Sequence, residues 1–138
     1  LYEQTLEDST RILGPHHPHT LTSRNNLAGA YRDAGRLDEA IALYEQTLED
    51  STRILGPHHP HTLTTRNNLA NAYQAAGRLD DAIPLHEQTL EDSTHILGPH
   101  HPRTLSTRKH LANAYLAAGR SEEARKLRDA VRIPLRRH

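Results

Sequence analysis

The sequence of 138 residues contains no cysteine, tryptophan, phenylalanine or methionine. The absence of cysteine excludes disulfide bonds and thiolate metal sites. It leaves the cellular compartment open, because a reducing cytosol does not require cysteine. Without the largest apolar side chains, the core must be built mainly from leucine, alanine and isoleucine with five tyrosines. Such a thin core suits layers of packed helices.

The chain also lacks a net charge, because its 17 lysines and arginines balance its 17 aspartates and glutamates. A neutral chain is not drawn nonspecifically to nucleic acid or to an anionic membrane, so neither is expected as a partner. No stretch approaches the roughly 20 apolar residues that span a bilayer. The N-terminus also lacks the charged-then-apolar pattern of a signal peptide. The sequence therefore predicts a soluble, cytoplasmic protein.

A period of 42 residues organises the chain. Segment 43–84 differs from segment 1–42 at six positions and from segment 85–126 at twelve. A fixed period of this length predicts an array of stacked units, none of which could bury its apolar face alone. The period therefore predicts the architecture but leaves the particular task open.

Each unit contains two runs of apolar or small residues at helical spacing. In the first full unit these are Leu21, Leu27, Ala28, Tyr31 and Ala34, then Leu37, Ala40, Ile41, Tyr44, Leu48, Ser51 and Leu55. Gly35 lies between the runs and can take the left-handed conformation that ends one helix and lets the next fold back. Gly56-Pro57 ends the second helix, and Pro60 suits the first position of the next one. We name the two helices of each unit helix A and helix B.

This punctuation predicts an all-α fold with about seven helices. A single array should fill residues 1–138, with a partial leading helix at 1–13 and repeats at 18–55, 60–97 and 102–133. The last repeat should act as a C-terminal cap, and its helix B should end before Pro134, leaving a basic tail at 134–138. Pro84 should bend its helix without breaking it. Because Leu1 aligns inside a helix and no initiator methionine is present, we expect a piece of a longer protein.

The string N-N-L-A-x-A-Y-x-x-A-G-R-x-x-E/D-A-I-x-L-Y/H-E-Q-T-L resembles the tetratricopeptide repeat. The packing positions of that repeat fall on Leu27, Ala28, Tyr31, Gly35, Ala40 and Tyr44 and on their copies. The 42-residue period, with L-G-P-H-H-P-H-T-L before N-N-L-A, is similar to the kinesin-light-chain type, whose bacterial relatives often sit in large multidomain regulatory proteins. His16 and His19 depart from the acidic residues common in that type, and Lys109-His110 replaces Asn-Asn in the third unit.

The resemblance implies a right-handed superhelical solenoid whose concave face, lined by A helices, binds a peptide or a partner segment. It implies binding rather than catalysis. The candidate peptide-binding residues are Asn25, Asn26, Asn67, Asn68, Asn71, Lys109 and Asn113, near Thr22, Gly29 and Arg32 or Asp33 and the counterparts of these residues. An asparagine amide can bond both the N–H and the C=O of an extended backbone. Alternatively, these amides cap or bridge neighbouring helices. Lys109 and Asn113 could also capture a carboxylate, which resembles a clamp of some tetratricopeptide domains.

The twelve histidines cluster in the connecting loops, as at His16, His17 and His19. We expect no physiological metal site and no cofactor, because adjacent histidines diverge and no carboxylate or thiolate recurs with them at ligand spacing. The resemblance implies a structural role for His17, His59 and His101. Since imidazoles titrate near pH 6.5, the loop edge becomes more positive below neutral pH, and we expect weaker self-association or lower stability at pH 5 than at pH 7.5.

Two other functions are less well supported by the residues. An enzyme is not expected, because the chain has no nucleophile elbow, no phosphate-binding glycine loop and no H-E-x-x-H motif. The repeated E-Q-T-L-E-D run is expected to form an exposed helix face. The alternative to peptide binding is a structural segment that self-associates through its exposed N-terminal helix, where Leu6, Ile12 and Leu13 lack an outer neighbour. The primary hypothesis is a protein-binding module within a larger regulatory or scaffold protein.

Overall fold

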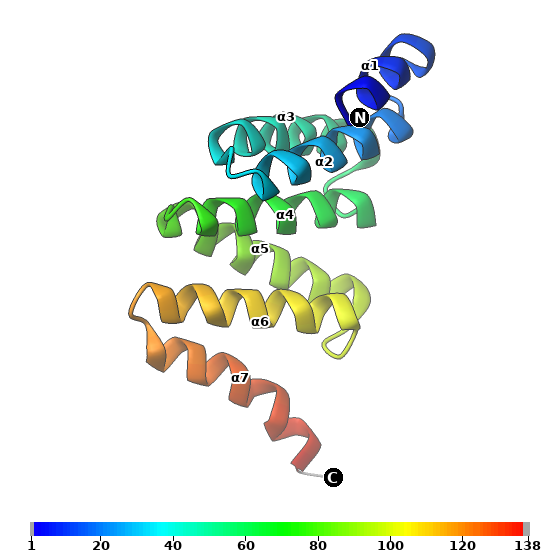
Figure 1. The fold of residues 1–138 in the computed structure, drawn as a ribbon. Coiled ribbons are helices and arrows are strands. Elements are labelled where there is room, and N and C mark those ends of the chain that lie inside the picture. Colours follow the sequence, from blue (N-terminus) through cyan, green and yellow to red (C-terminus); the bar gives the residue numbers. More distant parts are fainter. Residues whose placement is uncertain (1, 137–138) are drawn as a thin grey trace.

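The computed structural model describes the backbone of residues 2–136 and the side chains of residues 2–130 (Figure 1). These residues form seven helices and no strand: α1 (Tyr2–Leu13), α2 (Pro18–Asp33), α3 (Leu37–Leu55), α4 (Pro60–Ala75), α5 (Leu79–Leu97), α6 (Pro102–Ala117) and α7 (Ser121–Arg136). Helices α2, α4 and α6 form one layer, and α3 and α5 lie behind it (Figure 1). The predicted all-α solenoid of antiparallel helix pairs is confirmed.

The turn residues act as their chemistry predicts. Gly35 has a φ of 81°, and the following Arg36 N–H donates to the Tyr31 carbonyl at 2.8 Å, which closes the end of α2. At the other turn, Gly56 has a φ of 99° before Pro57. His59 then caps α4, because its Nδ1 accepts a hydrogen bond from the His61 N–H at 3.0 Å. His17 and His101 cap α2 and α6 in the same way, so these loop histidines position helices.

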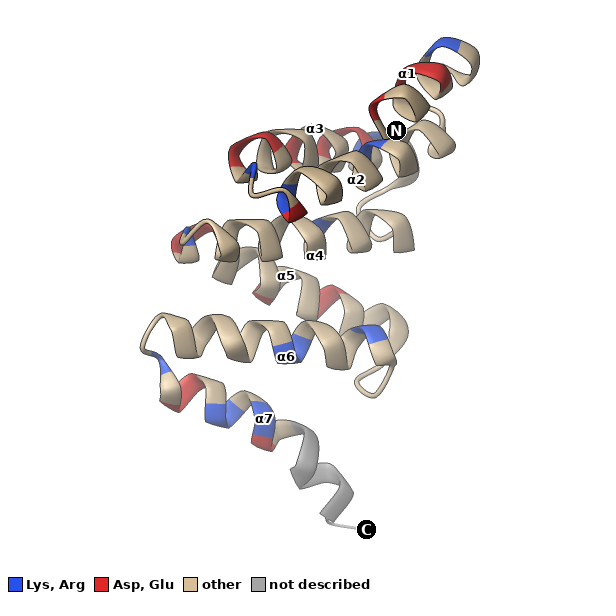
Figure 2. Cartoon of the chain, viewed as in Figure 1, with Lys and Arg blue, Asp and Glu red and all other residues tan. Residues whose placement is uncertain are grey.

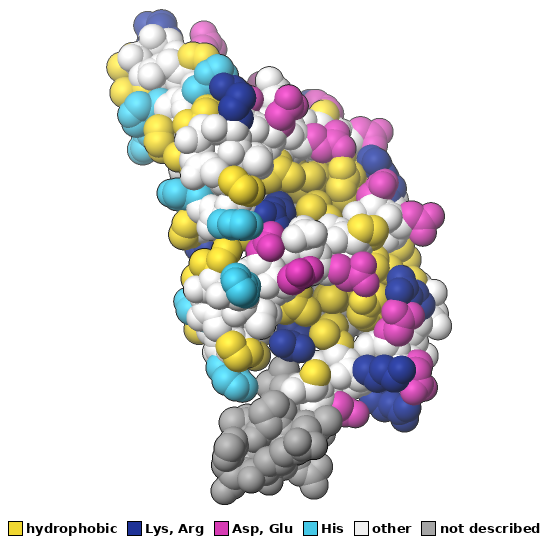
Figure 3. Space-filling view, turned by 180° about the vertical axis from the view of Figure 1, so that it is seen from behind, with side chains coloured by type: hydrophobic (Ala, Val, Ile, Leu, Met, Phe, Trp, Pro, Cys, Tyr) yellow, Lys and Arg dark blue, Asp and Glu magenta, His cyan; other side chains and the backbone are white. Residues whose placement is uncertain are grey.

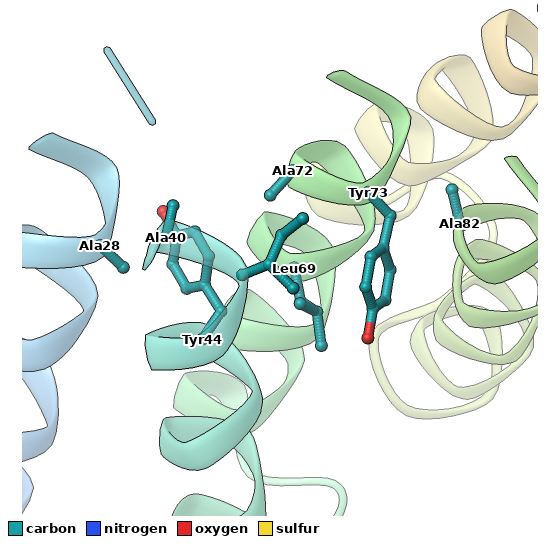
Figure 4. Packing of buried hydrophobic residues seen from close by; sticks show 8 residues of the cluster. Ala28, Ala40, Tyr44, Leu69, Ala72, Tyr73 and Ala82 are labelled. Atoms are coloured by element: carbon teal, nitrogen blue, oxygen red, sulfur yellow. The ribbon is translucent and has the colours of Figure 1, made fainter. Parts of the chain in front are cut away.

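The core runs continuously between repeats. One cluster combines Ala28 of α2 with residues of the next three helices: Ala40, Ile41, Tyr44, Leu69, Ala72, Tyr73 and Ala82 (Figure 4). Small alanines let the helices approach closely, while tyrosine and leucine fill the remaining space. Buried threonines complete the layers, and Thr47 satisfies its hydroxyl by donating to the Leu43 carbonyl of its own helix at 2.7 Å. Each helix pair therefore depends on the next pair for its burial.

Buried ion pairs join helix A to helix B in two repeats. Arg24 Nη1 lies 2.6 Å from Asp50 Oδ2, and Arg66 repeats this contact with Asp92 at the same distance. The side chains of the first pair are only 8% and 14% exposed. Burial alone would raise the pKa of Asp50, but hydrogen bonds from Arg24 and Arg53 lower it. The carboxylate therefore stays ionised inside the repeat.

The two predictions about proline have different outcomes. Helix α5 continues through Pro84, so the expected absence of a break is confirmed. Helix α7 continues to Arg136, and the predicted end before Pro134 is wrong. A proline removes only one backbone donor, and α7 extends less than one turn beyond it. The rest of the predicted basic tail, residues 137–138, lies outside the described residues.

Within the described part, no helix has the length and apolar character needed to cross a membrane.

Candidate functional site

The predicted peptide-binding residues all lie on A helices. Asn25 and Asn26 belong to α2, Asn67, Asn68 and Asn71 to α4, and Lys109 and Asn113 to α6. We call the surface formed by α2, α4 and α6 the A-helix wall. Asn26, Lys109 and Asn113 are exposed, whereas the other four are partly buried. The wall therefore contains two kinds of asparagine.

Asn25 and Asn67 bridge neighbouring repeats. The Asn25 side-chain amide donates to Thr65 Oγ1 at 2.9 Å, which joins α2 to α4. Asn67 Oδ1 lies 3.4 Å from His110 Nδ1, which joins α4 to α6. A further contact of 3.0 Å between Thr22 Oγ1 and His61 Nε2 strengthens the first junction. The alternative that the amides bridge neighbouring helices therefore holds for Asn25 and Asn67.

The other four asparagines keep their amides available. Asn26, Asn68, Asn71 and Asn113 make no hydrogen bond with any other described side chain or with a carbonyl beyond their own helix. Asn26 and Asn68 line a pocket of about 580 Å³ together with Asn25. Gly29, Arg32 and Asp33, which the sequence placed near the site, line the same pocket. The structure therefore brings the predicted residues of α2 together with Asn68 of α4, while Asn71 lies outside this pocket.

Lys109 and Asn113 line a second pocket, of about 320 Å³, at the other end of the wall. Two further cations line this pocket, Arg108 of α6 and Arg128 of α7, and no carboxylate does. Sequence reasoning missed both. The signal was the period itself: the aspartates that pair with Arg24 and Arg66 recur at positions 50 and 92, but position 134 holds proline.

Arg108 accordingly has no carboxylate partner within the part of the chain that the structure describes. Its Nη1 donates to the Leu127 carbonyl at 3.3 Å, and its Nε is buried without a partner. Burial lowers the pKa of Arg108 from its ordinary value, because the charged guanidinium loses hydration without gaining a counter-ion. An anion at this pocket would supply the missing countercharge.

One histidine lies in the core instead of in a loop, and it was not identified from the sequence. His86 of α5 is fully buried, at the position that Tyr44 occupies one repeat earlier, and neither ring nitrogen has a hydrogen-bond partner among the described residues. Its ring centroid lies 6.0 Å from that of His110. Burial, followed by the charge of His110, lowers the pKa of His86 to about 4. No group of three or more metal-ligating side chains occurs among the described residues.

The two helix layers carry opposite charge, which the neutral composition conceals (Figure 2). Helices α3 and α5 each contain five acidic residues and together only one lysine or arginine, Arg53. Helices α2, α4 and α6 contain one acidic residue, Asp33, and six lysines and arginines. Arg24 and Arg66 are neutralised by Asp50 and Asp92, so the excess positive charge of the A-helix wall comes from α6, and the opposite surface is acidic.

The stacked antiparallel pairs, each joined to the next by a shared core, define a helical repeat module that presents two extended surfaces. A family model described as the tetratricopeptide repeat matches residues 1–50, 25–94 and 66–128. The chain belongs to the tetratricopeptide repeat family. It is thus a repeat module of the kind that mediates protein interactions.

Solved structures refine this relationship. The nearly identical TPR-like repeats of a Podosopora anserina protein described as a kinesin light chain are 35% identical, with a TM-score of 0.87. That match covers 94% of this chain and 62% of the other, so the chain spans less than two thirds of that protein. BtubC (BKLC) from P. vanneervenii is 25% identical, with a TM-score of 0.79 and coverage of 95% of this chain and 55% of that one.

The TPR domain of Arabidopsis FLU shares the fold at 19% identity, with a TM-score of 0.69 and coverage of 86% and 96% of the two chains. No curated protein matches the sequence. The predicted similarity to kinesin-light-chain repeats is confirmed by the first of these structures.

Proposed function

We propose that the A-helix wall binds an extended segment of a protein partner on the concave face of the superhelix. The observation that carries this proposal is the set of asparagine amides with no partner in the described structure, above all Asn68 and Asn71 at the centre of the wall. An amide that offers two donors and one acceptor holds a peptide backbone without selecting its side chains. We infer that the chain acts as an interaction scaffold rather than as an enzyme.

The pocket lined by Arg108, Lys109 and Arg128 would fix the orientation of the bound segment along the wall. Lys109 and Asn113 are exposed beside Arg108 and Arg128, so a carboxylate of the ligand would be neutralised there. Hydrogen bonds to a carboxylate from cationic side chains are shorter and stronger than those between neutral groups. We therefore infer a preference for segments with an acidic residue or a free C-terminus at the α6 end. The array would serve this purpose inside a larger regulatory or scaffold protein.

A peptide array probed with the purified chain tests the proposal. Asn68→Ala and Asn71→Ala should each weaken the hits by about three- to tenfold, since each removes hydrogen bonds worth about 1 kcal/mol. Lys109→Ala should weaken only peptides that carry an acidic residue. Gln46→Ala is the matched control, because it shortens an exposed amide side chain on α3. Hits that survive both asparagine substitutions would overturn the proposal.

A second candidate is self-association through α1. Ile12 of this helix is 72% exposed and Leu13 is 42% exposed, so the described surface of α1 retains apolar area that a second copy could cover. In this case the mass measured by light scattering should rise with concentration, and Ile12→Ser should abolish the rise. A constant monomer mass over the same range would contradict this candidate.

A further inference from the structure

The face opposite the A-helix wall carries an apolar groove between the B helices α3 and α5 (Figure 3). The groove has a volume of about 540 Å³. Its floor consists of Leu48 of α3, Leu69 and Tyr73 of α4, and Pro84 and Leu85 of α5. We call it the B-helix groove. It lies within the array, where both of its walls belong to complete repeats.

The rim of the B-helix groove is acidic. Glu45, Glu49 and Asp81 line it, and no lysine or arginine does. The Tyr73 hydroxyl donates to Glu45 at 2.5 Å, and Arg78 pairs with Asp81 at 2.9 Å. These two carboxylates are held by the fold.

Glu49 differs from them. It is exposed and has no partner among the described residues. It therefore projects a free negative charge beside an apolar floor. Of the ten carboxylates on α3 and α5, Glu39, Asp50, Asp81 and Asp92 pair with arginines, and the other six leave this face negative. The unbalanced charge of this face favours a cationic partner.

The position of Pro84 independently supports a binding role for the B-helix groove. It lies inside α5, where the equivalent residues of the other repeats are Ala42 and Lys126. A proline inside a helix removes a backbone hydrogen bond, and Pro84 is exposed, so burial in the core does not offset this cost. Its ring instead adds a rigid apolar surface to the floor of the groove.

We propose that the B-helix groove docks a cationic amphipathic segment of a protein partner. An apolar side chain of that segment would rest on Leu48, Pro84 and Leu85, while a flanking lysine or arginine would pair with Glu49. Burial of the apolar side chain supplies most of the affinity, and the acidic rim selects the charge of the partner. The site is independent of the A-helix wall, so two different segments can be bound at the same time.

The test uses two helical peptides of the same length, one built from leucine and lysine and one from leucine and glutamate. Their binding to the full chain is measured by fluorescence anisotropy. The Leu/Lys peptide should bind, and the Leu/Glu peptide should bind at least about tenfold more weakly. Glu49→Lys should weaken the Leu/Lys peptide about tenfold. Pro84→Ala should weaken it several-fold while helix content, measured by circular dichroism, stays equal or rises.

Glu91→Lys is the matched control, because Glu91 is the copy of Glu49 one repeat later and does not line the groove. It should reduce binding far less than Glu49→Lys. Equal losses in the two variants would overturn the proposal, because they would indicate general attraction to the acidic face. Equal binding of the two peptides would overturn it as well. Dimerisation of the chain that Glu49→Lys abolishes would also overturn it, since a second copy would then be the occupant.

Discussion

Acid should destabilise this protein well above the pH at which its carboxylates titrate, because of His86. In the native state the pKa of this buried imidazole is about 4, whereas an unfolded chain binds the proton near pH 6.5. A histidine with a lowered native pKa has no effect on stability above pH 6.5. Below that value the unfolded chain binds a proton at His86 that the folded chain does not bind. The free energy of unfolding therefore falls until the pH reaches the native pKa.

The size of the effect follows from the two pKa values. Between pH 7.5 and pH 5 the free energy of unfolding should fall by about 2 kcal/mol, and by pH 4 the loss should reach about 3 kcal/mol. Burial also lowers the pKa of His61 and His110, so both contribute with the same sign. For a domain with a stability of about 5 to 15 kcal/mol, such a loss is readily measured.

Urea unfolding followed by circular dichroism at pH 7.5 and pH 5 tests this reasoning. His86→Phe places an aromatic ring without a titratable nitrogen where the preceding repeat has a buried Tyr44, and it should remove most of the pH dependence. His100→Gln, at an exposed loop position, is the matched control and should leave the pH dependence unchanged. The reasoning fails if His86→Phe retains the full dependence, and the loop histidines account for the effect if His100→Gln removes it.

Two further substitutions, each with a matched control, test a buried ion pair and the turn at a helix end by urea unfolding. Asp92→Asn leaves the Arg66 guanidinium buried without its counter-ion and should cost about 3 kcal/mol, whereas Glu91→Gln on the exposed side of α5 should cost less than about 0.5 kcal/mol; similar losses would refute the ion-pair argument. Gly77→Ala forces a non-glycine residue to a φ of 77° and should cost about 1 to 2 kcal/mol. Gly29→Ala, inside α2 with ordinary space for a methyl group, should stabilise by up to about 1 kcal/mol; a loss there as large as at Gly77 would contradict the conformational explanation.

The fold was predictable because its determinants are local and repeated. Gly35 ends a helix through its own backbone freedom, and Pro60 begins one through its fixed φ, whatever surrounds them. The helix bounds at Pro18, Leu37 and Leu55 therefore agree with those expected from the sequence. The end of α7 was not predictable in this way, because a single proline within the last turn weakens a helix without deciding where it stops.

The candidate site was only partly predictable, because its asparagines occur in adjacent pairs. Successive residues of a helix are rotated by about 100°, so Asn67 and Asn68 cannot both serve the same surface. Asn67 turns to His110 of the next A helix, whereas Asn68 makes no such contact. Which of the two would turn inward depends on the neighbouring repeat. Periodicity within one helix does not contain that information.

His86 and Arg108 show a different limit of the sequence reasoning. Both occupy positions whose copies had an evident role, Tyr44 in packing and Arg24 in an ion pair. The exchange of tyrosine for histidine is visible in the sequence, but its burial is not, because most other histidines of the chain cluster in or beside the connecting loops. The loss of the aspartate partner of Arg108 could have been read from the period once the Arg24–Asp50 pair was known.

The separation of charge between the two layers gives the two proposed surfaces different salt dependence. Exposed charge pairs weaken as ionic strength rises, because the Debye length falls from about 10 Å at 0.1 M salt to about 3 Å at 1 M. A cationic segment in the B-helix groove depends on Glu49, so its affinity should fall steeply over that range. A neutral peptide held by Asn68 and Asn71 should retain its affinity, since amide hydrogen bonds carry no net charge.

The two surfaces can be told apart by combining salt with the substitution Asn68→Ala. A cationic peptide whose binding weakens in salt and is unchanged by Asn68→Ala occupies the B-helix groove. A neutral peptide whose binding is unchanged by salt and is lost with Asn68→Ala occupies the A-helix wall. A single cationic ligand that is sensitive to both changes would mean that the two surfaces are not independent, and it would refute the assignment of one partner chemistry to each layer.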